Sequence, residues 1–352
     1  MRVAVLTSGG DAPGMNGVIR TIAVAGIARG WDVVGVRRGY DGLLRGDVIP
    51  LPFDVVDGIT RIGGTILGSA RCAAFGRPEG RAEAVAQIRR LGIDALVVVG
   101  GNGSLTGAHL LAADRPCRIV GLPASIDNDI GHCGLAIGVD TAVNTIVEAC
   151  DRISDTARAH RRAFIVEVMG RHCGFLAMRA GIAAEADAIL YSERQPSEDE
   201  LVDRLRTVLR RCLGPEGRHK RALIIKAEGV AVSTARLVER LQQHLHEDAP
   251  GVDIRPTILG HVVRGGNPSA MDRLVGQRLG YGAVLAVDAG LHDVMLGWDV
   301  PELVGRETAD PYIRAVPLAD VLAETRRLLD GTSPLVRKRI ELLRQVEDLL
   351  AL

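Results

Sequence analysis

Aromatic side chains are scarce in this sequence, making up only 3% of its 352 residues. Proteins that bind single-stranded nucleic acid stack bases on aromatic rings, so this scarcity argues against that class. Lysine is also rare, since only Lys220, Lys226 and Lys338 occur and arginine supplies the other basic side chains. The 43 basic and 43 acidic residues balance. A net charge of zero argues against a general nucleic-acid binder or a polybasic membrane-surface protein.

Long apolar runs and paired cysteines are missing too. No uninterrupted apolar stretch reaches the roughly 18 residues that a membrane span needs. The first strand-like run begins at Arg2, which leaves no room for a cleaved signal peptide, so we expect a cytoplasmic protein. The six cysteines are scattered without a C-x-x-C pair. This pattern argues against a disulfide framework and against a structural zinc site, and it favours reduced thiols.

Short apolar runs alternate with longer amphipathic segments along most of the chain. The runs predict strands at residues 3–6, 33–36, 95–99, 119–122, 163–168 and 222–226, and the period predicts helices at 15–29, 139–153 and 335–350. Near-continuous apolar strands separated by helices indicate a mostly parallel sheet covered on both faces. The predicted fold class is therefore α/β, and the length suits two domains.

Three glycine-rich segments have the composition of phosphate-binding loops: residues 7–16, 63–71 and 99–104. Glycine lets the backbone approach a phosphate, and free N–H groups at a helix start favour negative charge. None of them is a Walker A loop or a dinucleotide fingerprint. One such segment alone is more typical of a plain strand–helix turn. Because loops at the carboxyl ends of parallel strands converge, three together favour a polyphosphate site.

Two carboxylates, Asp127 and Asp129, follow another apolar strand. One can accept a proton from an attacking hydroxyl while the other holds a metal ion. A turn that caps the next helix is the alternative. The neighbouring phosphate loops favour the catalytic interpretation.

The second half of the chain supplies cations suited to an anionic substrate. Arg162, Arg171 and Arg255 lie near the ends of apolar runs, and His261 and Arg264 precede a glycine pair. Arginine binds phosphate through two parallel hydrogen bonds, which a solvated surface arginine does not need.

Taken together, these motifs resemble the 6-phosphofructokinase family, which comprises the glycolytic kinases and their pyrophosphate-using relatives. The segments that carry the resemblance are residues 9–16, 63–71, 125–129, 166–174 and 260–266. The resemblance extends from Val3 to about Arg278. The resemblance implies two doubly wound, Rossmann-like domains with mostly parallel sheets and the active site in the cleft between them. Residues 1–138 plus about 265–313 would bind the nucleotide, and residues 139–264 plus about 314–352 would bind the sugar phosphate.

The reaction implied by the resemblance is phosphoryl transfer from ATP to the 1-hydroxyl of fructose 6-phosphate, with Asp127 as the general base. Arg71, Arg171 and the Gly10 N–H would stabilise the transferred group, with Mg²⁺ near Asp129. The implied nucleotide-binding residues are Gly10, Tyr40, Arg71, Cys72, Gly101, Asn102, Gly103, Ser104 and Gly107. The implied substrate-binding residues are Ser125, Asp127, Asp129, Arg162, Met169, Gly170, Arg171, Glu228, Arg255, His261 and Arg264. In the family, Arg162 and Arg255 would come from a neighbouring subunit, which implies a homotetramer, or otherwise a homodimer.

Two positions bear on the phosphoryl donor. The pyrophosphate-using relatives typically carry aspartate where Gly103 stands here and lysine where Ala124 stands. Glycine leaves room for a nucleotide, so ATP is favoured over pyrophosphate.

Asn102 replaces the aspartate that most of the family has. Asparagine keeps an oxygen acceptor but lacks the negative charge, so we expect weaker magnesium binding or slower turnover.

Other interpretations remain open at this stage. They are pyrophosphate as donor, another ketose phosphate such as sedoheptulose 7-phosphate as acceptor, a catalytically weak or idle paralogue because of Asn102, and a member of the NAD-kinase and lipid-kinase group.

The positions that form the family's effector site for ADP or phosphoenolpyruvate read Arg20, Val24, Phe53, Ser154 and Asp187. Most of the cations of that site are missing, so we expect little control by those effectors.

Overall fold

The computed structural model describes residues 1–217, 219–300 and 304–350. Contacts divide the chain into two compact units. The first unit comprises Met1–Thr141 and Arg264–Leu328, and the second comprises Ala142–Val263 and the chain from Leu329 on. Among the described helices, none has the length and apolar composition that crossing a bilayer requires.

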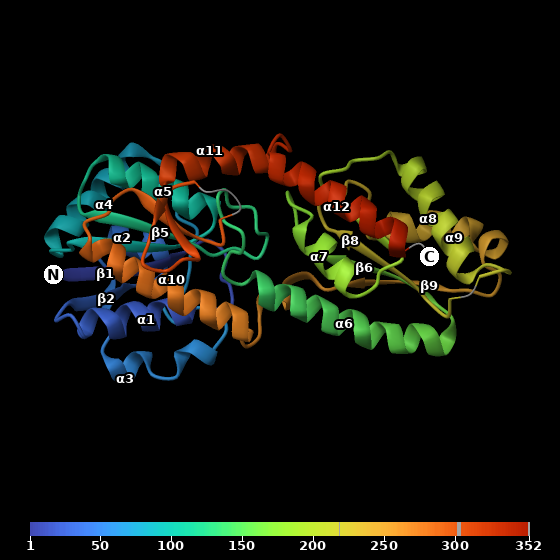
Figure 1. Ribbon diagram of the computed structural model, residues 1–352, viewed down its shortest axis with the longest axis horizontal. Helices are drawn as coiled ribbons and strands as arrows, with labels where there is room; N and C mark the ends of the chain where they lie inside the picture. Colours follow the sequence, from blue (N-terminus) through green and yellow to red (C-terminus); the bar gives the residue numbers. More distant parts are fainter. Residues whose placement is uncertain (218, 301–303, 351–352) are drawn as a thin grey trace. The chain divides into compact units, whose positions relative to one another are not determined.

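A single mixed sheet forms the centre of the first unit (Figure 1). Its strands are β1 (Arg2–Ser8), β2 (Asp32–Val36), β3 (Val48–Pro50), β4 (Ala95–Gly100), β5 (Arg118–Pro123), β10 (Val294–Trp298), β11 (Arg306–Glu307) and β12 (Ile313–Pro317). Their order is β11-β12-β10-β5-β4-β1-β2-β3. The pairs from β10 through β2 are parallel, whereas β3, β11 and β12 pair antiparallel at the two edges.

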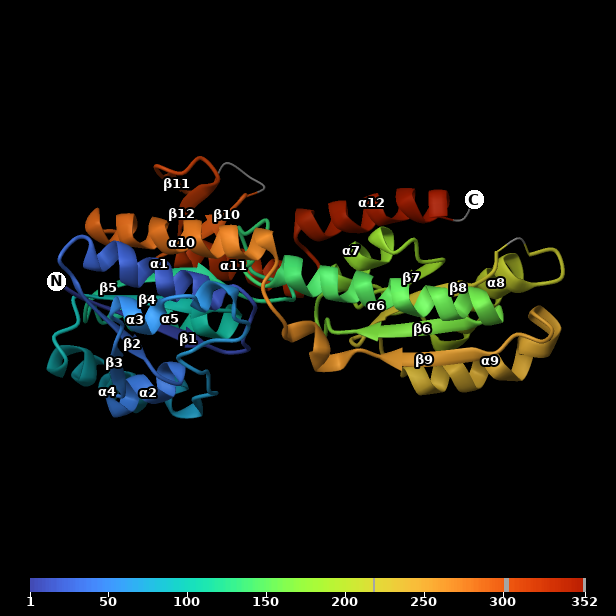
Figure 2. The same cartoon turned by 90° about the horizontal axis from the view of Figure 1, so that it is seen from below.

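Helices cover both faces of this sheet, as expected for near-continuous apolar strands. Helices α1 (Met15–Ile27) and α10 (Ala270–Asp288) lie on one face, and α2 (Gly39–Arg45) and α4 (Pro78–Arg90) lie on the other (Figure 2). The remaining helices of the unit are α3 (Phe53–Val56), α5 (Asn102–Ala113) and α11 (Leu318–Leu329). Helices α1 and α10 pack closely because Gly276 has no side chain, and a Cβ there would lie 2.7 Å from the Gly14 carbonyl oxygen.

The second unit is built on a smaller, wholly parallel sheet of β6 (Ala163–Val168), β7 (Ala188–Leu190), β8 (Ala222–Ala227) and β9 (Ile254–Ile258), in the order β7-β8-β6-β9. Its helices are α6 (Val139–His160), α7 (Phe175–Ala183), α8 (Glu198–Leu213), α9 (Thr234–Asp248) and α12 (Pro334–Leu350). The apolar sides of α8 and α9 pack with the strands into one buried cluster. Helix α8 begins with a capping box, in which Ser197 and Glu200 exchange hydrogen bonds.

The structure confirms the predicted α/β class and the mostly parallel sheets. Each predicted strand is present, and β6 has the predicted bounds. Helix α6 continues to His160, beyond the predicted end at residue 153. The contacts divide the later part of the chain after Leu328. The segment that contains β12 belongs to the first unit because β12 pairs with β10 and β11 in the sheet of that unit.

Candidate active site

A cavity of about 650 Å³ opens in the first unit beside the loops that follow β1, β4 and β5. The chain passes from β1 to β2 on one side of the sheet, and β4 then adds on the other side of β1. The loops after β1 and β4 therefore diverge, and such a switch point is where open parallel sheets bind ligands. The cavity lies where the glycine-rich segments predicted a phosphate site.

Most of the candidate residues are brought together here. The expected nucleotide-binding and carboxylate-loop residues that line the cavity are Gly10, Tyr40, Arg71, Cys72, Gly101, Asn102, Gly103, Ser104, Gly107, Ser125, Asp127 and Asp129. Arg264, expected to bind the sugar phosphate, lines the same cavity. A Cβ on Gly10 would lie 2.8 Å from Arg264 Nη1, so glycine at this position is what admits the guanidinium.

The segment 62–68 is fixed against β1 and α1 by two polar side chains. Asn16 Nδ2 donates to the Ile62 carbonyl oxygen at 2.9 Å, and the Ile66 N–H donates to Asn16 Oδ1 at 2.8 Å. Thr7 Oγ1 donates to the Gly68 carbonyl oxygen at 3.0 Å. Because Asn16 is buried and bonds in both directions, it holds the segment that leads to Arg71 in one conformation.

An aromatic pair forms one wall of the cavity. The rings of Tyr40 and Phe75 stack with centroids 3.9 Å apart, and Tyr40 Oη donates to the Ser104 carbonyl oxygen at 2.7 Å. Burial raises the pKa of Tyr40 far above its ordinary value, so the hydroxyl stays protonated. A Cβ on Gly107 would lie 2.9 Å from Phe75, so this helix position must be glycine. Phe75 was not predicted from the sequence, because a lone aromatic residue in a short turn carries no pattern.

The carboxylate loop is held by its own side chains. Ser125 Oγ donates to Asp129 Oδ1 at 3.2 Å and accepts from the Asp127 N–H at 3.3 Å. Asn128 has a left-handed backbone with φ of 49°, and its side chain is buried. That side chain donates to the Gly134 carbonyl oxygen at 3.0 Å and accepts from the Ala136 N–H at 2.9 Å. Asn128 thus orients the two aspartates on either side of it.

Oxygen atoms suited to a magnesium ion lie at the start of α5. Asn102 Nδ2 donates to Asp129 Oδ2 at 2.7 Å. Asn102 Oδ1 is buried and has no hydrogen-bond partner among the described residues. Carboxylate and amide oxygens are the hard ligands that Mg²⁺ prefers, and a buried amide oxygen without a partner is satisfied by a cation or its waters. Asp129 and Asn102 therefore fit the group that the sequence analysis placed there.

A second set of candidate residues lies in the second unit. Arg171 and Glu228 line a cavity of about 600 Å³ beside the loops that follow β6 and β8. Met169 and Gly170 come directly after β6, and Gly170 has a φ of +133°, which favours glycine. The Gly229 N–H donates to the Gly170 carbonyl oxygen at 3.2 Å, so the two loops are joined.

Arg162 and Arg255 do not join this set. Arg162 precedes β6 and Arg255 is the second residue of β9, so both lie at the amino end of the parallel sheet. Both contact Asp253, whose Oδ2 lies 2.7 Å from Arg255 Nε and 3.7 Å from Arg162 Nε. The length of β6, about 20 Å at roughly 3.3 Å per residue, separates them from Arg171. His261 is exposed in the short 3-10 helix Gly260–Arg264.

Comparison with known proteins identifies the family. The family model described as "Phosphofructokinase" matches residues 2–287. The ATP-dependent 6-phosphofructokinase of Thermotoga petrophila is 45% identical over 329 residues, which cover 94% of this chain and 96% of that protein. Its counterpart in Thermotoga neapolitana is 47% identical over the same shares. The chain belongs to the phosphofructokinase family.

The solved structures agree. The T-state crystal structure of Pichia pastoris phosphofructokinase superposes with a TM-score of 0.86 at 35% sequence identity. The match covers 98% of this chain and 39% of that longer chain. The family resemblance predicted from five short motifs is confirmed.

Proposed function

We propose that this protein transfers the terminal phosphoryl group of ATP to the 1-hydroxyl of fructose 6-phosphate and releases fructose 1,6-bisphosphate. The observation that carries the proposal is the cavity in which the carboxylate loop of Asp127 and Asp129 meets the glycine-rich segments around Gly10 and Gly103. Support comes from the Thermotoga relatives, which are named ATP-dependent 6-phosphofructokinases and match over nearly their whole length.

In this proposal Asp127 takes the proton of the sugar hydroxyl as that oxygen attacks the phosphorus. Arg71 and the Gly10 N–H stabilise the charge of the transferring group, and Arg171 assists from the sugar-phosphate side. Phosphoryl transfer depends mainly on such positioning and electrostatic stabilisation. Asp129 and Asn102 would hold Mg²⁺, which neutralises phosphate charge when it is bound. Tyr40, Cys72, Gly101, Ser104 and Gly107 would contact the nucleotide.

ATP is proposed as the donor because of the space at Gly103. A Cβ built on Gly103 meets no atom within 4 Å, so this wall of the cavity is open. An aspartate there would place a negative charge in the space a nucleotide phosphate would take. Pyrophosphate is the second candidate donor, and sedoheptulose 7-phosphate is the second candidate acceptor.

The sugar phosphate is proposed to bind the loops of the second unit through Met169, Gly170, Arg171 and Glu228, with Ser125, His261 and Arg264 contributing. Arg162 and Arg255 lie together at the opposite end of their sheet, some six strand residues away from Arg171. This placement supports the proposal that they serve the site of a neighbouring subunit. The assembly we propose is a homotetramer, with a homodimer as the alternative, working in the cytoplasm.

The test compares donors and acceptors in one experiment. Purified protein is assayed for bisphosphate formation from fructose 6-phosphate with ATP and with pyrophosphate, and from sedoheptulose 7-phosphate with ATP. We expect the highest kcat/KM for ATP with fructose 6-phosphate. A higher value with pyrophosphate or the seven-carbon sugar would replace one substrate in the proposal. Absence of turnover with every pair would identify a catalytically idle paralogue and overturn it.

A further inference from the structure

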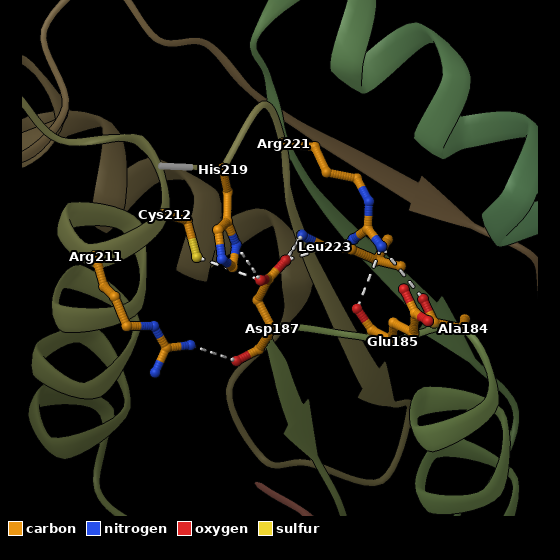
Figure 3. A network of polar contacts seen from close by, with 8 residues as sticks. All are labelled: Ala184, Glu185, Asp187, Arg211, Cys212, His219, Arg221 and Leu223. Atoms are coloured by element: carbon orange, nitrogen blue, oxygen red, sulfur yellow. Dashed lines mark hydrogen bonds and ion pairs between the residues drawn. The ribbon is translucent and has the colours of Figure 1, made fainter. Parts of the chain in front are cut away.

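Three side chains that commonly bind transition metals meet at one end of the second unit. Asp187 directly precedes β7, Cys212 lies in the last turn of α8, and His219 lies in the loop before β8 (Figure 3). One ligand atom from each lies within 4.8 Å of the other two. None of the three lines the cavity of the carboxylate loop or the cavity of Arg171. The proposed function makes no use of this cluster.

The distances from Asp187 to the other two ligands match those of a tetrahedral metal site. Asp187 Oδ1 lies 3.3 Å from Cys212 Sγ and 3.1 Å from His219 Nδ1. Ligand atoms that lie roughly 2.0–2.3 Å from a tetrahedral zinc ion are about 3.3–3.6 Å apart. The two distances from Asp187 Oδ1 match this geometry to within a few tenths of an ångström, and the ligand atoms of Cys212 and His219 lie within 4.8 Å of each other.

The carboxylate is oriented for this role by its other oxygen atom. Asp187 Oδ2 accepts from the Leu223 N–H at 2.8 Å and from Arg221 Nη1 at 3.4 Å, which leaves Oδ1 directed at the thiol and the imidazole (Figure 3). Arg221 is held on the far side, because its Nη2 donates to the Glu185 carbonyl oxygen at 3.2 Å. Groups that fix a ligand in this way are typical of metal sites.

Solvent can supply the remaining ligand. Asp187 and His219 also line a cavity of about 400 Å³, together with Arg158, Glu185, Lys220 and Arg221. We propose that Asp187, Cys212 and His219 bind one zinc-class divalent cation, with water as the fourth ligand. The thiol proton passes to solvent when the sulfur binds the ion, since the thiolate is the ligand form.

The sequence argued against a structural zinc site because its cysteines form no C-x-x-C pair. A C-x-x-C pair marks only those sites whose ligands are close in sequence. Here Asp187 and His219 lie in loops and Cys212 lies in α8, and the fold brings Asp187 to the other two.

The experiment is a cobalt titration of the full-length protein after removal of metals with a chelator. Cobalt(II) bound to a thiolate gives a charge-transfer absorption that a carboxylate–imidazole site does not. We expect one equivalent per chain with this absorption, and zinc should displace the cobalt and raise the melting temperature. Cys212→Ser should abolish the absorption, and His219→Gln should weaken binding by roughly tenfold or more. Cys150→Ser is the matched control, since Cys150 is a buried cysteine of α6 in the same unit.

The proposal is overturned if the original protein shows no thiolate–cobalt absorption, or if Cys212→Ser and His219→Gln bind cobalt as tightly as the original. The His219 ring is about one-third exposed, so that variant tests the site even if Cys212→Ser fails to fold. The readout is metal binding, so failure here says nothing against the proposed kinase activity, and the reverse also holds.

Discussion

Asn102 donates a hydrogen bond to Asp129, with 2.7 Å between Asn102 Nδ2 and Asp129 Oδ2. An aspartate at position 102, which the resemblance describes for most of the family, could not donate to that carboxylate. Two carboxylates there would repel each other unless a cation lay between them. The Asn102 amide therefore holds Asp129 in place without a metal ion. The site then has one negative charge fewer with which to bind a metal ion.

Asn102→Asp should tighten magnesium binding, because it restores that charge beside Asp129. We expect the magnesium concentration for half-maximal turnover to fall on the order of tenfold, equivalent to about 1.4 kcal/mol. The measurement is the initial rate against free magnesium at fixed ATP. Asn267→Asp, which adds the same charge at an exposed position of the first unit, is the control and should change nothing. An unchanged magnesium dependence in Asn102→Asp would remove this explanation of the asparagine.

Gly103→Asp should reduce the use of ATP. The space for a Cβ is open, so the fold should tolerate the side chain, but its charge would face the phosphates. We expect kcat/KM for ATP to fall roughly 10- to 100-fold, or about 1.4–2.7 kcal/mol of transition-state stabilisation. Gly103→Asn supplies a side chain of the same size without the charge and should lose much less. Equal losses in the two variants would mean that space rather than charge decides the donor.

Asn128 positions the carboxylate loop, so its substitution should affect both stability and turnover. Asn128→Ala removes two buried hydrogen bonds and leaves a strained left-handed alanine. We expect the free energy of unfolding to fall by about 2–4 kcal/mol, and Asn128→Gly to lose about 1 kcal/mol less because glycine relieves the strain. Urea unfolding of both variants checks this. Turnover should fall in both, and full turnover in Asn128→Ala would show that the loop needs no such support.

Arg278 stabilises the first unit through two aromatic rings and a carboxylate. Its guanidinium carbon lies 4.6 Å from the Trp298 ring centroid and 4.8 Å from that of Tyr312, and it binds Asp310 through two nitrogens. Burial alone would raise the pKa of Asp310, but the hydrogen bonds from Arg278 and the Tyr312 N–H outweigh it and lower that pKa. This contribution to stability is therefore complete above the ordinary carboxyl range and is lost as the pH falls through the lowered pKa.

Arg278→Met should accordingly lower the free energy of unfolding by about 1–3 kcal/mol at neutral pH. The difference from the original protein should narrow in acid, where Asp310 is protonated in both. The measurement is urea unfolding of both proteins, at neutral pH and at a pH below the ordinary carboxyl range, which gives the difference in their free energies of unfolding. A difference that stays constant with pH would assign the stabilisation to the ring contacts alone.

Predicted strands such as β4 and β6 are buried on both faces and leave a continuous apolar run. Strands β7 and β10 are also buried apolar runs, but they were not predicted. Strand β9 was missed because Arg255, Pro256 and Thr257 give it no such run. The two-residue strand β11 is too short to leave any pattern.

The residues of the site also fall into those that could be predicted from the sequence and those that could not. Glycine-rich loops and the Asp127–Asp129 pair are local signals, so the residues of the first cavity could be predicted. The separation of Arg162 from Arg171 could also be read from their places before and after one strand. The stacking of Phe75 on Tyr40 and the cluster around Asp187 depend on tertiary placement, which no spacing in the sequence records.

The central claim is that Asp127 accepts the proton of the attacking sugar hydroxyl. The most direct test is kcat of Asp127→Asn with ATP and fructose 6-phosphate, with Asp114→Asn, an exposed carboxylate at the end of α5, as the control. Loss of a general base should lower kcat by about 10²- to 10⁴-fold while nucleotide binding is retained. A kcat for Asp127→Asn within a few-fold of the original protein would contradict the account.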